Sequence, residues 1–180
     1  MSPPLATVQL RLPDESFTAR LGALIARALI AERARVDANG FVLGLSGDLG
    51  AGKTALVRAC LRELGVAGPV RSPTFTLLEP YVVSSLNFYH FDFYRFGNPD
   101  EFADSGFREL FGPGTVCAVE WPERAGGALP TPDLDVTLNV ADEGRIATLL
   151  ARSEGGVACL QHVRTGWADQ AAHGASSAGG

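Results

Sequence analysis

The clearest chemistry in this chain of 180 residues lies in one stretch of eight, GDLGAGKT, from Gly47 to Thr54. It fits the pattern G-x-x-x-x-G-K-[ST] between an apolar segment and an amphipathic one, the setting in which such a stretch binds phosphate. Glycines let backbone N–H groups approach phosphate oxygens, and the start of the following helix adds partial positive charge. The residues expected to bind a nucleotide here are Gly47, Asp48, Leu49, Gly50, Ala51, Gly52, Lys53, Thr54 and Ala55.

Lys53 is the sole lysine among the fifteen lysine and arginine residues. A narrow side chain with a compact ammonium can reach the β- and γ-phosphates from inside a tight turn, where a planar guanidinium would be bulkier. The hydroxyl of Thr54 is suited to a Mg²⁺ ion beside those phosphates. We therefore expect Lys53 to contact phosphate and Thr54 to bind Mg²⁺.

Other nucleotide-binding classes share part of this pattern. Gly50-x-Gly52-x-x-Ala55 fits the looser dinucleotide fingerprint, which needs an acidic residue about 20 positions further on. The stretch VRSPTFTLL at 70–78 has none. A GTPase is disfavoured as well. Selection of guanine in that class uses a motif that resembles Asn-Lys-x-Asp, and the chain has no second lysine to build it. Two alternatives remain open. One is a P-loop kinase for a small molecule, although no insertion with clustered arginines indicates a lid. The other is a nucleotide-sensing module with negligible turnover.

Two carboxylates could hold the metal ion or orient water. Glu120 ends the apolar segment VCAVE, and Asp92 follows the apolar and aromatic segment NFYHF. An acid at the end of a buried strand beside a P-loop is where a metal-binding carboxylate belongs. The residues leave open which of the two binds metal and which positions water.

Four motifs, GDLGAGKT, VRSPTFTL, HFDFYR and VEWPE, follow one another along the chain. In this order and spacing they resemble the TsaE (YjeE) family, the ATPase subunit of the bacterial machinery that makes threonylcarbamoyladenosine in tRNA. The resemblance runs from the first expected helix to about Leu150. Phe93 stands where the family pattern has leucine, an apolar exchange that puts little in doubt.

The resemblance implies ATP and Mg²⁺ as ligands. It implies catalytic roles for Lys53, Asp92 and Glu120, with Thr54, Asp92 and Glu120 at the metal. Thr74, in a switch-like loop, would approach the γ-phosphate, and Trp121 would lie beside the nucleotide. Arg95 could stabilise the transition state, contact a partner or pair with Asp92 or Glu109, whereas His90 is expected to be a packed strand residue.

The resemblance also implies partners. They would be TsaB- and TsaD-type subunits, and ATP hydrolysis, slow in isolation, would act as a switch on their complex. The net charge is −5 and no basic run is visible, so we expect tRNA to be bound only indirectly, through those partners.

Strands and helices that could position these residues are visible as patterns of apolar residues. Strands are expected at 7–12, 41–47, 75–83, 86–94, 115–121, 133–140 and 145–152, and the connection between 75–83 and 86–94 is short enough for a hairpin. Helices are expected after a cap at Asp14 or Ser16, at 54–64 with Gly65 ending it, and at 100–111, where Gly106 could split it. The fold class predicted is α/β, a P-loop NTPase-like three-layer domain whose mostly parallel central sheet carries added antiparallel strands.

Composition bounds the remaining possibilities. The apolar runs are far shorter than the roughly 20 residues of a membrane span. The start lacks a basic segment followed by a long apolar one, and the three cysteines are scattered, so we expect a cytoplasmic protein without a membrane partner. One ATPase domain is expected over 1–164. The glycine-rich segment 165–180 is expected to be a disordered tail, with Trp167 its one candidate for an anchor.

Overall fold

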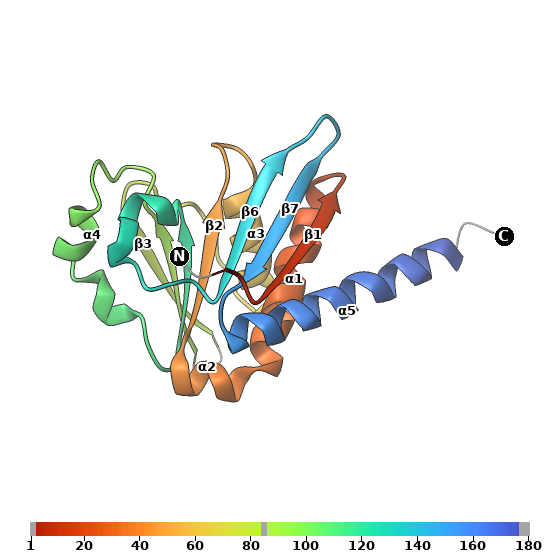
Figure 1. The fold of residues 1–180 in the computed structure, drawn as a ribbon, viewed down its shortest axis with the longest axis horizontal. Coiled ribbons are helices and arrows are strands. Elements are labelled where there is room, and N and C mark those ends of the chain that lie inside the picture. Colours follow the sequence, from red (N-terminus) through yellow and green to blue (C-terminus); the bar gives the residue numbers. More distant parts are fainter. Residues whose placement is uncertain (1–2, 84–85, 177–180) are drawn as a thin grey trace.

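A computed structural model, which describes residues 3–83 and 86–176, has a seven-stranded mixed sheet with helices packed on it (Figure 1). The elements in chain order are β1 (Ala6–Leu12), α1 (Glu15–Ala31), α2 (Arg33–Asn39), β2 (Phe41–Ser46), α3 (Lys53–Glu63), β3 (Leu78–Val83), β4 (Leu86–Asp92), α4 (Asp100–Asp104), the 3₁₀ segment η1 (Phe107–Leu110), β5 (Thr115–Glu120), the 3₁₀ segment η2 (Pro122–Ala128), β6 (Leu134–Val140), β7 (Arg145–Ala151) and α5 (Glu154–Ser176).

The strand order is β1-β7-β6-β2-β5-β4-β3. β2 pairs in parallel with both β5 and β6, and β4 pairs in parallel with β5. The hairpins β3–β4 and β6–β7 are antiparallel, and so is the pair β1–β7. Five strands (β1, β2, β4, β5 and β6) thus run one way and two the other, which confirms the predicted sheet with its antiparallel additions.

The two faces of the sheet carry separate apolar clusters. On one face, α1, α3 and α5 pack over the larger cluster; on the other, α4, η1 and η2 cover a smaller one rich in phenylalanine. Side chains alternate between the faces along β5, with Val116 and Ala118 in the larger cluster and Cys117 and Val119 in the smaller. The same alternation directs Glu120, at the end of β5, to the face that α3 covers.

Helix α1 packs closely against α3. A Cβ at Gly22 would lie 2.4 Å from the carbonyl oxygen of Leu56, so only glycine allows this approach. The predicted cap is confirmed: the Asp14 carboxylate accepts from the N–H of Ser16 at 2.7 Å. The first turns of α1 are therefore held beside the start of α3.

The break that Gly106 could introduce is confirmed, and two helical segments were not predicted. The predicted helix at 100–111 is divided by Gly106, whose φ is +74°, into α4 and η1. Helix α2 was not predicted, because Val36 is its one buried residue and leaves no apolar periodicity. The residues before 165 in α5 were likewise not assigned to a helix.

The prediction of a disordered tail from Thr165 is wrong as far as Ser176, because α5 continues to that residue and crosses the expected boundary at 164. The composition of this segment predicted disorder, but the expected anchor, Trp167, docks the helix on α1. Its ring lies 6.0 Å from the ring of Phe17, and the guanidinium of Arg20 lies 4.4 Å from its centroid. Arg20 also donates to the carbonyls of Gly166 and Trp167, at 3.1 and 2.6 Å. Residues 177–180 lie outside the described residues.

None of the helices in the described part of the chain is long and apolar enough to cross a membrane. Cys60, Cys117 and Cys159 are buried and free, and burial raises the pKa of Cys117 and of Cys159 to about 12.

Trp167→Ala should destabilise the protein, because it removes a half-buried ring and the surface on which Arg20 stacks. We expect a loss of about 1–2 kcal/mol, less than the 3–5 kcal/mol of a fully buried aromatic. In a domain of this size that lowers Tm by roughly 2–8 °C in thermal melts followed by circular dichroism. Val140→Ala, at an exposed position, is the control. Equal melting temperatures for the two variants would contradict the docking of α5 on α1.

Candidate functional site

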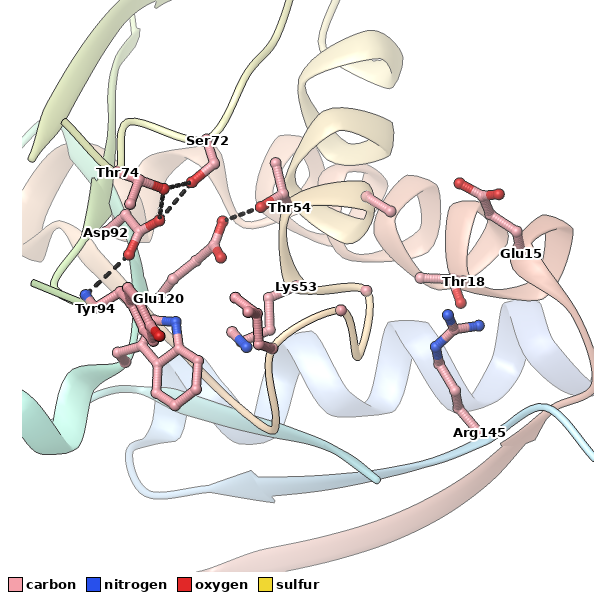
Figure 2. Close-up of a pocket in the computed structure, with 15 residues that line it drawn as sticks. Glu15, Thr18, Lys53, Thr54, Ser72, Thr74, Asp92, Tyr94, Glu120 and Arg145 are labelled. Carbon is pink, nitrogen blue, oxygen red and sulfur yellow. Dashed lines mark hydrogen bonds between the residues drawn. The ribbon is translucent and has the colours of Figure 1, made fainter. Parts of the chain in front are cut away.

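A cleft of about 380 Å³ opens at the carboxyl ends of the parallel strands (Figure 2). The P-loop leads from β2 into α3 along its floor, and β4 and β5 end on one side of it. The start of α1 and the start of β7 form the other side. This is the edge of an α/β sheet at which ligands bind.

The P-loop has a backbone that only glycine adopts without strain. Gly47 has φ +136°, and a Cβ there would lie 2.3 Å from the carbonyl oxygen of Leu138 on β6; Gly52 has φ +110°. Within residues 3–83 and 86–176, the backbone N–H groups of Gly52, Lys53 and Thr54 have no acceptor, as expected at a helix start. Unpaired amides and a helix N-terminus together favour an anion.

The predicted nucleotide-binding residues divide into two sets. Leu49, Gly50, Gly52, Lys53, Thr54 and Ala55 line the cleft, as do Thr74 and Trp121. Gly47, Asp48 and Ala51 do not line it. The carbonyls of Gly47 and Asp48 face Lys53, whose ammonium donates to them at 2.6 and 2.9 Å, and Ala51 is buried beneath the turn.

Lys53 is buried, and its ammonium lies 4.0 Å from the centroid of the Trp121 ring. Burial lowers the pKa of Lys53, while the carboxylates of Glu120 and Asp92 oppose that shift. Trp121 has a left-handed backbone, with φ +58°, and donates its N–H to the carbonyl of Leu45 at 3.1 Å. The turn after β5 thus holds the indole over the lysine.

Glu120 is fixed beside Thr54. One carboxylate oxygen, Oε1, accepts from the Thr54 hydroxyl at 2.8 Å and lies 2.8 Å from Nε2 of His90. Glu120 is 3% exposed and His90 is fully buried. His90 is the packed strand residue that was predicted, but it is also a partner of the Glu120 carboxylate, a role that the sequence did not indicate.

Asp92 lies next to Glu120 across the parallel pair β4–β5 but has different partners. Its Oδ2 accepts from the hydroxyls of Ser72 and of Thr74, the latter at 2.8 Å, and its Oδ1 accepts from the N–H of Tyr94 at 2.9 Å. Figure 2 shows these contacts on the wall opposite Arg145. Asp92 therefore attaches the loop at 72–74 to the end of β4.

Arg95 points away from the predicted acidic partners. Its guanidinium lies 4.2 Å from the centroid of the Phe75 ring, which is 84% exposed. Within the part of the chain that the structure describes, Arg95 forms no ion pair with Asp92 or Glu109. The motif loops thus present an arginine and an aromatic ring together on the surface.

Several residues of the cleft were not predicted. Ser72 and Tyr94 lie inside the quoted motifs, so their spacing could have indicated them. Thr18 and Arg145 lie far from those motifs in sequence, on α1 and at the start of β7. Nothing in the sequence distinguishes Arg145 from the other arginines, because its position beside the P-loop depends on the whole sheet.

The described residues hold no group of three or more histidine, cysteine, aspartate or glutamate side chains that could bind a metal ion. A Mg²⁺ ion needs no such group, since it commonly takes one or two carboxylates together with substrate phosphates and waters. The Thr54 hydroxyl and the Glu120 carboxylate, in contact on the cleft wall, are a donor set of that kind.

Known proteins share both the sequence and the fold. Residues 12–147 match the family described as threonylcarbamoyl adenosine biosynthesis protein TsaE. A protein of Haemophilus influenzae named tRNA threonylcarbamoyladenosine biosynthesis protein TsaE is 37% identical over 142 residues, 79% of this chain and 88% of that protein. One of the same name from Bacillus subtilis is 41% identical over 113 residues, 62% and 70% of the two chains. A crystal structure of Bacillus subtilis YdiB superposes with a TM-score of 0.68 at 27% identity, covering 91% of this chain and 98% of that one.

Trp121 should report ligands in the cleft, because a bound phosphate competes for the ammonium that lies over its ring. In a Trp167→Phe variant, Trp121 is the only tryptophan. We expect ATP with Mg²⁺ to change its emission in a saturable way. The control is the Trp121→Phe variant. Its remaining tryptophan, Trp167, does not line the cleft, so its emission should not change with ATP. An unchanged spectrum of Trp121 at saturating ATP would separate the indole from the ligand site.

Proposed function

The chain belongs to the TsaE family of threonylcarbamoyl adenosine biosynthesis proteins, and on that premise we propose that it is a Mg²⁺-dependent ATPase in the formation of threonylcarbamoyladenosine in tRNA. The observation that carries the proposal is the P-loop cleft, in which unpaired amides and the sole lysine face the paired Thr54 and Glu120. Phosphoryl transfer depends on positioning and on charge stabilisation, and these groups can supply both.

Binding would use the P-loop. The amides at the start of α3 would donate to phosphate oxygens, and Lys53 would exchange its two carbonyl acceptors for the β- and γ-phosphates. Because this ammonium is buried, its attraction to phosphate is screened less than at the surface. Trp121 would cover the same site.

Thr54 and Glu120 would hold Mg²⁺, with Asp92 close by. When bound, the ion would neutralise charge that develops on the phosphates. His90 keeps Oε1 of Glu120 in place, because it is fully buried and in hydrogen-bond contact with that oxygen. We assign Glu120 to the metal side of the site for this reason.

Asp92 would connect the cleft to the surface. It bonds the hydroxyls of Ser72 and Thr74, so a γ-phosphate that engaged Thr74 would draw on the same hydrogen bonds. The next residue, Phe75, is exposed and stacked with Arg95. A change at Thr74 would thus reach a surface suited to a partner, which supports a switch on a complex of TsaB- and TsaD-type subunits.

The role in the pathway would be indirect. A net charge of −5 does not suit a chain that binds tRNA on its own, since phosphate contacts need lysine or arginine surfaces. Arg95 lies on the Phe75 ring, so it is not directed at the cleft. A partner arginine is therefore the expected source of additional transition-state charge.

Lys53→Ala should weaken ATP binding by about 100-fold or more, because it removes charge-assisted hydrogen bonds to two phosphates. Isothermal titration calorimetry with Mg²⁺ and ATP measures the change. Arg27→Ala, which removes an exposed arginine, is the control and should bind like the parent protein. ATP affinity that survived in a folded Lys53→Ala variant would exclude a P-loop role for this stretch.

Phosphate release should be slow for the isolated chain and rise when TsaB- and TsaD-type subunits are added. A finger arginine supplied by a partner raises turnover by roughly 10³–10⁵-fold in related chemistry. Glu120→Gln should keep ATP binding and lose the stimulation. The same assays with tRNA added, and with a search for a phosphorylated small molecule, test the alternative. Phosphate transferred to an acceptor, or full activity without partners, would favour a kinase or a self-contained ATPase.

A further inference from the structure

The middle of α5 meets the first half of α1, and Figure 1 shows α5 crossing that helix. Val163, Gly166 and Trp167, at the spacing i, i+3 and i+4, share one face of α5. Val163 is fully buried, and a Cβ at Gly166 would lie 2.4 Å from Cδ2 of Leu24 on α1. The two helices therefore pass each other closely at this face.

Arg20 joins the two helices by polar contacts. Its Nη2 donates to the carbonyl oxygens of Gly166 and Trp167, and its guanidinium lies 4.4 Å from the centroid of the Trp167 ring. The Trp167 ring also packs against Phe17, which lies in the first turn of α1. Phe17, Arg20 and Leu24, at i, i+3 and i+7, thus form the face of α1 that meets α5. Hydrogen bonds fix the orientation of the helices as well as their distance.

The same turns of α1 meet the P-loop on another face. Thr18 directly follows Phe17, and its Cγ2 would lie 3.7 Å from a Cβ at Gly52. Glu15 and Thr18 both line the cleft. Packed interiors transmit small displacements, so a shift of Phe17 and Arg20 would also move the side of α1 that forms the cleft wall. One residue along the helix separates the contact with α5 from the contact with the P-loop.

We propose that Arg20 and Trp167 are positioning residues for the cleft. They hold the first turns of α1 against the P-loop, so nucleotide binding and the docking of α5 strengthen each other. Neither residue lines the cleft, so both act through α1. Such a coupling is reciprocal, because two sites that favour one conformation raise each other's affinity by the same factor. The assignment rests on the proposed ATP-binding function and adds a part of the fold on which the affinity for ATP depends.

Calorimetry with Mg²⁺ and ATP tests the coupling. Trp167→Ala should weaken ATP binding by about 5-fold or more, the lower end of coupling between sites. Trp167→Phe keeps a ring against Phe17 and should bind within about 2-fold of the parent protein. Val83→Ala is the matched control. It removes buried methyl groups where β3 meets the start of β4, at the edge of the sheet opposite the cleft. It should lower Tm and leave the affinity for ATP unchanged.

Arg20→Met gives a second route to the same contact. Methionine keeps a long apolar side chain and removes the donors to the two carbonyls of α5. ATP binding should weaken in this variant, and the double variant with Trp167→Ala should bind hardly more weakly than either single one, because both changes act on one contact. This variant keeps the proposal testable if Trp167→Ala folds poorly.

Hydrogen exchange in the parent protein tests the reciprocal effect without a substitution. ATP with Mg²⁺ should slow the exchange of backbone amides in residues 160–167, because the ligand favours the docked α5 and so reduces its local opening. The edge strand β3 is the control segment, since it lies at the other end of the strand order from α1 and α5. A helix with a purely structural role would show no more change than β3.

Two results would overturn the coupling. In one, Trp167→Ala binds ATP as Val83→Ala does. In the other, ATP changes exchange in residues 160–167 no more than in β3. Failure of the parent protein to bind ATP is a different outcome, because it would remove the proposed function and the coupling with it.

Discussion

The cleft depends on the close passage of the P-loop under strand β6. Gly47 lies against the carbonyl of Leu138 with a left-handed backbone, and a side chain at this position would collide with β6. The same turn leaves the first amides of α3 without acceptors among the described residues and draws Lys53 back over the loop. Helix α1 can then approach from the other side, because Gly22 brings it against α3. The site therefore depends on the absence of a side chain at these two glycines.

The neighbouring parallel strands β4 and β5 each end in a carboxylate, and the two carboxylates have different hydrogen-bond partners. Glu120 bonds Thr54 of the P-loop, whereas Asp92 bonds Thr74 of the following loop. The strands are in register at these residues, so the carboxylates lie side by side while their hydroxyl partners belong to separate segments. Such an arrangement lets one ligand act on the helix start and on the loop at the same time.

The parts of the site that the sequence predicted are those coded locally. Lys53 and Thr54 lie in a contiguous motif, and Asp92 and Glu120 end apolar strands, so strand periodicity and the parallel sheet were enough to bring them together. Thr18 and Arg145 reach the cleft only through the packing of α1 and the pairing of β7 with β1 and β6, which no local pattern encodes. The composition of the C-terminal segment did not predict α5. The helix docks on α1 through one ring, Trp167, and the small residues around that ring gave no sign of this contact.

The buried position of the single lysine has a consequence for chemical labelling. Elsewhere the chain carries its positive side-chain charge on arginine, which reagents for ε-amines do not modify. Their one side-chain target is Lys53, enclosed between the P-loop carbonyls and the Trp121 ring. Acylation at Lys53 would therefore measure access to the P-loop cleft, and cross-linking of lysine side chains would say little about the surfaces of the protein.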